Sequence, residues 1–163
     1  AVRICASTGA DLFACVAAGL SVQSGPMQVG GTLEVERLVA EVTTKPGGDS
    51  PKFTSALPCF GHPLYDKDPR ATVLLELARQ FTPQPPDAYR LWNILGDANA
   101  TGQYPNIFAA LVFTSYILGL PLGSGAFIHT LGRTAGWIAH ATEQRLTGTM
   151  LRPRARFMGA QPS

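Results

Sequence analysis

The sequence predicts an all-α protein, and three features support this prediction. Apolar residues recur at three- and four-residue spacing in successive segments, which is the period of a helix with one buried face. Glycine and proline separate these segments, and no long run alternates apolar with polar residues as a strand does. With 163 residues, the chain is also long enough to bury a hydrophobic core.

The first helix is expected over residues 8–22, although Gly9 and Gly19 lie within it. Its buried face is predicted from five residues at helical spacing: Leu12, Phe13, Val16, Ala17 and Leu20. The glycines and the proline of the segment 25–31 then break the helical pattern.

A second helix is expected over residues 32–43, with Leu38 and Val42 facing inward. The segment that follows, KPGGDSPK (45–52), is rich in glycine, proline and charge. It is predicted to be a loop.

Two further helices are predicted to begin at acidic residues. Asp68 followed by Pro69 is a typical helix start, since an acid caps the helix and proline suits the first helical position. The inner face of this helix is predicted from three apolar residues: Leu74, Leu77 and Phe81. The prolines of segment 83–86 end it, and Asp87 caps a helix over 88–99.

The last two helices are expected over residues 105–120 and 124–146. The first is strongly apolar, but it is too short to span a bilayer and carries Asn106 and Ser115, so it is predicted to be a core helix. The segment RPRARF (152–157) has no helical period and is interpreted as an extended basic tail.

Composition excludes several classes of protein. Hydrophobic residues make up 45% and charged residues 15% of the chain, which excludes disorder, and a net charge of +2 offers no basic surface for nucleic acid. The low charged fraction predicts a surface covered by a second copy, as in a homodimer.

Cys5, Cys15 and Cys59 lack metal-ligand spacing, so they are interpreted as buried free thiols in a reducing compartment, and no metal is expected. The sequence does not begin with methionine, and its first residues already belong to an apolar pattern, which suggests a piece of a longer protein.

His62 and Arg70 are the first candidate site residues. Gly61 and Pro63 flank His62 and restrict its loop, which favours a functional imidazole as much as a surface residue. Arg70 lies at a helix start, where the backbone already favours anions. The alternative for Arg70 is a surface salt bridge with Asp66 or Asp68.

Arg133 and Arg152 extend this candidate site. Arg133 shares a helix face with Trp137 and His140, and an arginine on such an apolar face needs an anionic partner, which Glu143 is not spaced to provide. Three arginines of the tail would face one side if the tail is extended: Arg152, Arg154 and Arg156. These arginines and His62, with no paired carboxylates, predict a pocket for a small polyanion.

The sequence resembles the citrate synthase family in three segments: FGHPLYDKDPRA, PNIFAALVFTSYILGLPLG and GRTAGWIAHATEQRLTGTMLRPRARFMG. A fourth segment, AVRICASTGADLFACVAAGLSVQSGP, is similar to the stretch before that family's first active-site loop. The resemblance runs nearly end to end and is broken mainly at 43–57. Its most specific part is GRTAGWIAH with RPRAR at the family's spacing.

The resemblance implies a nearly all-helical homodimer that condenses an acyl-CoA with oxaloacetate. Residues 1–122 would form mainly the small domain, and 123–163 the C-terminal helix and extended tail of the large domain, whose N-terminal portion would be absent. Acyl-CoA is then a possible co-substrate, no cofactor is permanently bound, and a cytoplasmic location is expected. Neither nucleic acid nor a membrane is expected as a partner.

The resemblance also implies roles for the candidate residues. His62 matches the histidine that hydrogen-bonds the oxaloacetate carbonyl and polarises it. Arg70 and Arg133 match arginines that clamp the carboxylates of oxaloacetate or citrate, and Arg152 matches one delivered to the neighbouring subunit's site. Such groups act by orientation and by electrostatic stabilisation in a dry cleft.

Two positions depart from the family pattern. The family loop Gly-Pro-Leu-His-Gly-Gly reads GPMQVGG here, so Gln28 takes the place of the histidine that stabilises the enol. A glutamine amide donates a hydrogen bond but cannot exchange a proton near neutral pH. In the family, the catalytic aspartate follows Pro-Asn closely. Here Phe108 is found at that place, so the aspartate is either replaced by Phe108 or deleted. Residues 105–122 contain no carboxylate at all.

Two functions of different classes stay open. The first is a citrate-synthase-type acyltransferase with weak or altered chemistry, or with groups supplied by a partner chain. The second is a non-catalytic sensor or partner subunit that binds a di- or tricarboxylate, which Gln28 and Phe108 favour. Asp66 stands where an arginine would help to bind CoA phosphate, which weakens the case for ordinary CoA binding. A helical interaction module without a small-molecule site is the least favoured reading.

Overall fold

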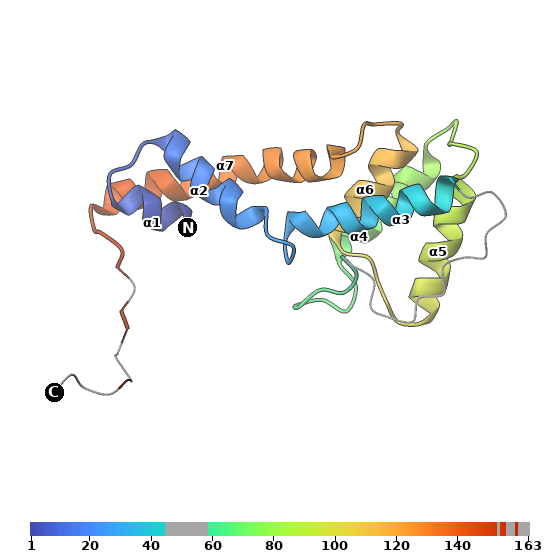
Figure 1. Cartoon of the computed structure of the whole chain (residues 1–163), viewed down its shortest axis with the longest axis horizontal. Coiled ribbons are helices and arrows are strands. Elements are labelled where there is room, and N and C mark those ends of the chain that lie inside the picture. The colour runs from blue at the N-terminus through green and yellow to red at the C-terminus, as the bar shows by residue number, and fades with distance from the viewer. Residues whose placement is uncertain (45–58, 153, 156–158, 160–163) are drawn as a thin grey trace. The chain divides into compact units, whose positions relative to one another are not determined.

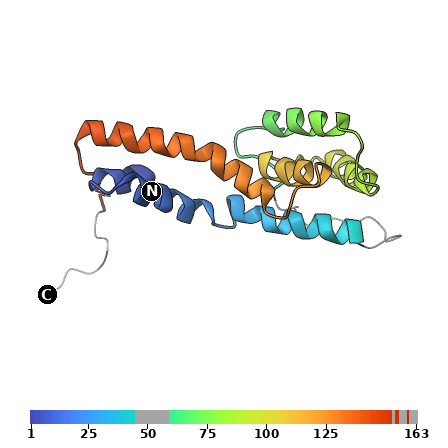
Figure 2. The same ribbon diagram turned by 90° about the horizontal axis from the view of Figure 1, so that it is seen from above.

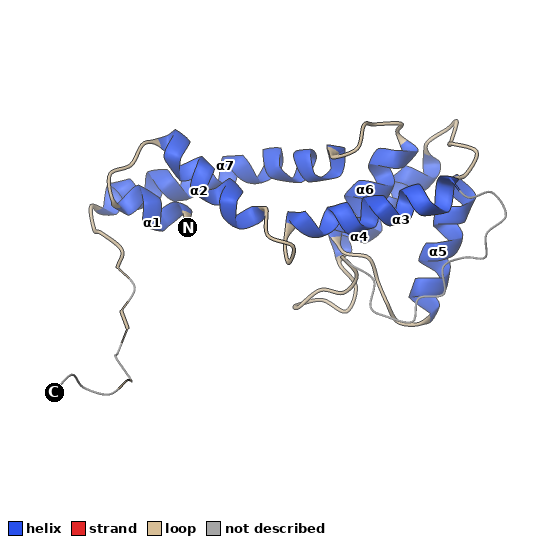
Figure 3. Cartoon of the chain, viewed as in Figure 1, coloured by secondary structure: helices blue, strands red, loops and turns tan. Residues whose placement is uncertain are grey.

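The computed structural model describes residues 1–44, 59–152, 154, 155 and 159, and its regular elements are helices (Figures 1 and 3). In chain order they are α1 (Val2–Ser7), α2 (Leu12–Gln23), the short 3₁₀ helix η1 (Val29–Gly31), α3 (Thr32–Thr44), α4 (Pro69–Gln80), α5 (Ala88–Ala100), α6 (Ile107–Ile117) and α7 (Ser124–Thr147). Within the described residues, the β-type pairing is limited to one isolated bridge between Phe60 and Pro105. The predicted all-α class is confirmed, whereas the predicted loop 45–52 and Arg156 lie outside the described residues.

The chain divides into two compact units, each with its own hydrophobic core. One unit consists of Ala1–Val22 with Arg133–Ser163, and the other of Gln23–Gly132. The assignment of residues 1–122 and 123–163 to the family's small and large domains stays a prediction. In the part of the chain that the structure describes, no helix combines the length and the apolar character needed to cross a membrane.

The core of the Gln23–Gly132 unit is built around α6. Figure 2 shows this helix between α4 and α3, and α6 packs against both. Side chains of α3, α5 and α6 form the cluster: Val35, Val39, Val42, Leu91, Ile94, Leu95, Ala109, Val112 and Phe113. The predicted burial of the apolar segment 105–120 and of Val42 is therefore confirmed.

The predicted inner face of α4 was wrong in this chain. Leu77 is 59% exposed and Phe81 is also exposed, whereas Ala71 and Ala78 are buried and Leu75 packs against the core. The small side chains of Ala71 and Ala78 allow α4 to lie close to α6.

The helix expected over 8–22 begins only at Leu12, as α2, and a separate helix that was not predicted, α1, precedes it. Gly9 has a φ of +84°, a left-handed conformation that ends α1, and the Asp11 carboxylate accepts a hydrogen bond from the Ala14 N–H at the start of α2. The predicted face is confirmed at Leu12 and Val16, which pack against the core of this unit, and is wrong at Phe13, which is 89% exposed, and at Leu20, which is exposed too.

The buried face of α2 carries small residues because Trp137 packs against it. The core of this unit comprises Val2, Ala6, Cys15, Trp137 and Ala141. A Cβ added to Gly19 would lie 2.8 Å from Trp137 Cδ2, so the indole occupies the space of a side chain there. All three cysteines are free as predicted, but full burial holds for Cys15 alone, where it raises the pKa of the thiol.

We expect Gly19→Ala to lower the free energy of unfolding by about 1–3 kcal/mol, because Trp137 must shift to admit the methyl group. Gly96→Ala is the matched control: no atom of the described residues lies within 4 Å of a Cβ added at this position of α5, so we expect a gain of up to about 1 kcal/mol. Urea unfolding of both variants measures the difference. A Gly19→Ala variant as stable as Gly96→Ala would contradict this packing.

Candidate functional site

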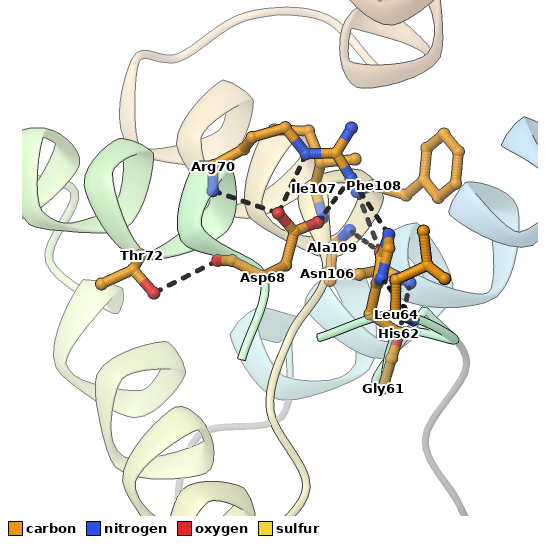
Figure 4. A network of polar contacts seen from close by, with 10 residues as sticks. All are labelled: Gly61, His62, Leu64, Asp68, Arg70, Thr72, Asn106, Ile107, Phe108 and Ala109. Atoms are coloured by element: carbon orange, nitrogen blue, oxygen red, sulfur yellow. Dashed lines mark hydrogen bonds and ion pairs between the residues drawn. The ribbon is translucent and has the colours of Figure 1, made fainter. Parts of the chain in front are cut away.

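The candidate site lies in the Gln23–Gly132 unit, where the loop before α4 meets the start of α6 (Figure 4). The backbone of this loop pairs with the segment leading into α6. The Gly61 N–H donates to Tyr104 O at 2.7 Å, and the Asn106 N–H donates to Cys59 O at 3.0 Å. These bonds fix the backbone on which His62 is placed.

Asp68 joins the beginnings of α4 and α6. Its carboxylate caps α4 by accepting from the Arg70 N–H at 3.1 Å, and it also accepts from the Ile107 N–H of α6 at 3.0 Å. The Arg70 side chain donates to the same carboxylate from Nε at 2.9 Å and from Nη2 at 2.8 Å. The salt bridge weighed as an alternative for Arg70 is therefore present, and it is bidentate.

The electrostatics of Asp68 follow from these contacts. The side chain is fully buried, and burial alone would raise the pKa of Asp68. Hydrogen bonds from the Arg70 side chain and from the Ile107 and Arg70 N–H groups outweigh burial and hold the pKa of Asp68 below its ordinary value. The same side-chain bond raises the pKa of Arg70.

His62 and Arg70 present hydrogen-bond donors to the same place. The Leu64 backbone N–H, which can only donate, lies 3.1 Å from His62 Nδ1, so Nδ1 is the acceptor and the neutral ring carries its hydrogen on Nε2. Arg70 Nη2 lies 3.4 Å from His62 Nε2 (Figure 4). The guanidinium of Arg70 and the imidazole of His62 therefore lie side by side at the start of α4.

Phe108 occupies the first turn of α6, at the position predicted for the base. Asn106 caps this helix, accepting from the Phe108 and Ala109 N–H groups, and its amide donates to Gly61 O at 3.2 Å. The Phe108 ring contacts the His129 imidazole, with 4.7 Å between ring centroids. The residue at the start of α6 is therefore an aromatic ring without an ionisable group.

Gln28 lies on a tight loop before η1 and is exposed. Its N–H donates to Gly25 O at 2.9 Å, and a Cβ added to Gly30 would lie 2.5 Å from Ser24 O. A Cβ added to Gly31 would lie 2.9 Å from Cys59 Sγ, so this loop packs closely against residue 59 of the His62 loop. The glycine pair is therefore required by close packing, whatever the chemistry of Gln28.

Arg133 and Arg152 lie in the other unit, so their convergence with His62 and Arg70 stays a prediction. Both are exposed, and the Arg133 guanidinium folds over its own helix, with Nη1 2.8 Å from a Cβ added to Gly136. Glu143, excluded above as a partner of Arg133, pairs with Arg3.

Sequence reasoning missed three contributors to this site. Asn106 precedes an apolar run, and its preference for the helix N-cap was a usable signal. The second role of Asp68, as acceptor for α6, and the contact of His129 with Phe108 join segments 39 and 21 residues apart, and no local pattern reports them. No cluster of three or more potential metal ligands occurs among the residues that the structure describes.

A family comparison matches nearly the whole chain. Residues 1–154 match the family described as citrate synthase, C-terminal domain. Citrate synthase of Haloferax volcanii is 28% identical over 169 residues, which cover 96% of this chain and 44% of that protein. Citrate/2-methylcitrate synthase of Bacillus subtilis is 30% identical over 173 residues, covering 98% of this chain and 46% of that protein. The chain thus spans less than half the length of these relatives.

Solved structures share the fold over the whole chain. Citrate synthase from Thermoplasma acidophilum, in a ternary complex with carboxymethyl coenzyme A and oxaloacetate, has a TM-score of 0.75 at 23% identity and is covered over 48% of its length. Citryl-CoA lyase from Hydrogenobacter thermophilus has a TM-score of 0.78 at 23% identity and is covered over 70%. In both cases the match includes 100% of this chain.

Proposed function

The chain belongs to the citrate synthase family. From this premise we propose that the protein binds a di- or tricarboxylate such as oxaloacetate or citrate. We also propose that it condenses this ligand with an acyl-CoA poorly or not at all. The donor pair of His62 and Arg70 carries the binding half of this proposal. The Nε2–H of His62 and the Nη2 of Arg70 face the same place, and an oxygen of a carbonyl or carboxylate accepts from both.

Asp68 prepares Arg70 for this role. It holds the guanidinium by two of its five N–H groups, while the Arg70 side chain remains 53% exposed. A held guanidinium loses less side-chain entropy when a ligand binds, which favours affinity. Arg133 and Arg152 are proposed as further carboxylate contacts, on the resemblance described above.

Phe108 and Gln28 carry the other half of the proposal. Removing a proton from an acyl methyl group needs a base, and phenylalanine offers no lone pair. Gln28 supplies at most a neutral hydrogen bond to an enolate oxygen. A non-catalytic sensor or partner subunit is the second candidate function, and the apolar Phe108 ring at the start of α6 is the observation that favours it.

The proposal has three further parts. The protein forms a homodimer, acyl-CoA is the co-substrate of any residual activity, and the protein is located in the cytoplasm. Phe13 in α2 and Leu146 in α7 are 89% and 83% exposed in the single chain. Apolar side chains exposed to this extent are typical of surfaces that a partner covers, and this supports the dimer.

We expect citrate to raise the melting temperature of the native assembly, because a ligand that binds the folded state alone stabilises it by about 2.7 kcal/mol at 100 times its Kd. Arg70→Lys keeps the charge but loses the planar fork, so we expect citrate to bind at least about tenfold more weakly. Arg37→Lys, on the exposed surface of α3, is the control and should bind as wild type does. A wild-type protein that millimolar citrate leaves unshifted would refute the proposal.

A further inference from the structure

A cavity of about 220 Å³ lies between α4 and α5 in the Gln23–Gly132 unit. Its apolar wall is formed by Leu75 of α4 and by Trp92 and Leu95 of α5, and these side chains belong to the core cluster or pack against it. Benzene binds in an engineered cavity of about 150 Å³, so this space admits a ring or a branched aliphatic side chain with further atoms attached. The cavity shares Asp68 with the candidate site.

Two opposite charges border this cavity without pairing. Glu76 and Arg79 both line it from α4, and residues three apart on a helix are neighbours. Glu34 and Arg37 have the same spacing on α3, and there the two side chains form an ion pair. Over the described ranges 1–44 and 59–152, neither Glu76 nor Arg79 forms one. A carboxylate and a guanidinium at the cavity are therefore both available to a ligand.

Trp92 explains why Arg79 does not pair with Glu76. The guanidinium carbon of Arg79 lies over the Trp92 ring, 4.5 Å from its centroid, in a cation–π contact. The indole N–H of Trp92 donates to Gln84 Oε1 at 2.9 Å, and the Gln84 amide donates to the Arg79 backbone O at 2.8 Å. Gln84 thus ties the ring to the end of α4, and the ring in turn holds the guanidinium.

We propose that this cavity binds an α-amino acid with a large apolar side chain. The ammonium group pairs with Glu76, the carboxylate pairs with Arg79, and the side chain lies in the apolar part of the cavity. Both charged groups of an α-amino acid are bonded to one carbon atom, and Cβ atoms at the spacing of Glu76 and Arg79 lie about 5–6 Å apart, so both charges are matched at once. A plain amine or a plain carboxylic acid would leave one of them without a partner. This second site is independent of citrate binding by His62 and Arg70.

L-Phenylalanine, added to the native protein, is the probe, and nitrogen-15 NMR of the indole N–H groups is the measurement. We expect the Trp92 signal to shift until it saturates, while the signal of Trp137, in the other unit, stays in place. N-acetylphenylalanine lacks the ammonium charge and phenylalaninamide lacks the carboxylate, so each should bind about tenfold more weakly, as for the loss of a hydrogen bond to a charged group. A Trp92 signal that millimolar L-phenylalanine leaves unshifted, or equal binding of the three compounds, would overturn the proposal.

Variants of the two charged residues test the same assignment from the side of the protein. Glu76→Gln and Arg79→Gln, both at exposed positions, should each weaken L-phenylalanine binding about tenfold. Glu34→Gln and Arg37→Gln are the matched controls on α3 and should bind as wild type does. Binding within about twofold of wild type by both cavity variants would overturn the site. Reversal of the Trp92 shift by coenzyme A would overturn it too, because the cavity would then belong to the co-substrate.

Discussion

We expect the protein, purified as it occurs in the cell, to release CoA from acetyl-CoA and oxaloacetate at least about 100-fold more slowly than enzymes with ordinary turnover of about 1–10³ s⁻¹. Phe108 offers no base for the acyl methyl proton, and loss of a general base costs about 10²–10⁴-fold. The absence of the enol-stabilising histidine at Gln28 need not multiply this cost, since groups that act together are not additive. A thiol-reactive dye that detects free CoA measures the rate.

The double variant Gln28→His, Phe108→Asp tests the cause of the low rate. We expect it to gain at least about 100-fold over wild type, because it regains both the base and the proton-exchanging donor. Gln28→His, Phe108→Asn is the matched control: asparagine has the shape of aspartate but cannot accept the proton at neutral pH. Ordinary turnover by the wild type, or equal rates of the two double variants, would show that another group serves as the base.

The second large effect concerns stability. We expect Asp68→Asn to lower the free energy of unfolding by about 2–4 kcal/mol, because it removes a buried charge that caps α4, holds Arg70 and accepts from the Ile107 N–H of α6. Asp66→Asn, on the exposed part of the same loop, is the control and should change stability by less than about 0.5 kcal/mol. Denaturant unfolding at pH 7 measures both.

The pH dependence of this difference checks its electrostatic origin. The pKa of Asp68 is lowered in the folded state, so its stabilising contribution is fully present above about pH 4, the ordinary pKa of an unfolded aspartate. The contribution is lost as the pH falls through the lower pKa of the folded state. The stability gap between wild type and Asp68→Asn should therefore narrow at acid pH. A gap that stays constant from pH 7 down to pH 2 would mean that the charge does not stabilise the fold.

The sequence by itself determined the helical class and most helix ends, because these depend on local chemistry. Asp68 caps α4 as predicted, and the apolar run after Asn106 is a buried helix. Asp87 stands at the predicted start of α5, but its side chain makes no capping hydrogen bond there. The sequence also singled out His62 and Arg70, whose side chains the structure brings to 3.4 Å. His62 and Arg70 are separated by eight residues in the sequence, with a helix start between them, so local chain geometry is almost enough to bring them together.

Only the tertiary structure decided which faces are buried and which partners meet. The side-chain spacing of α2 fits more than one apolar face, and Trp137, more than a hundred residues away, selects the face that carries Gly19 because only a small residue admits the indole. Likewise, the contact of His129 with Phe108 and the hydrogen bond of Asp68 to Ile107 depend on how separate helices pack. Periodicity specifies that a helix has a buried side, but the volume and hydrogen-bonding needs of its neighbours choose which side it is.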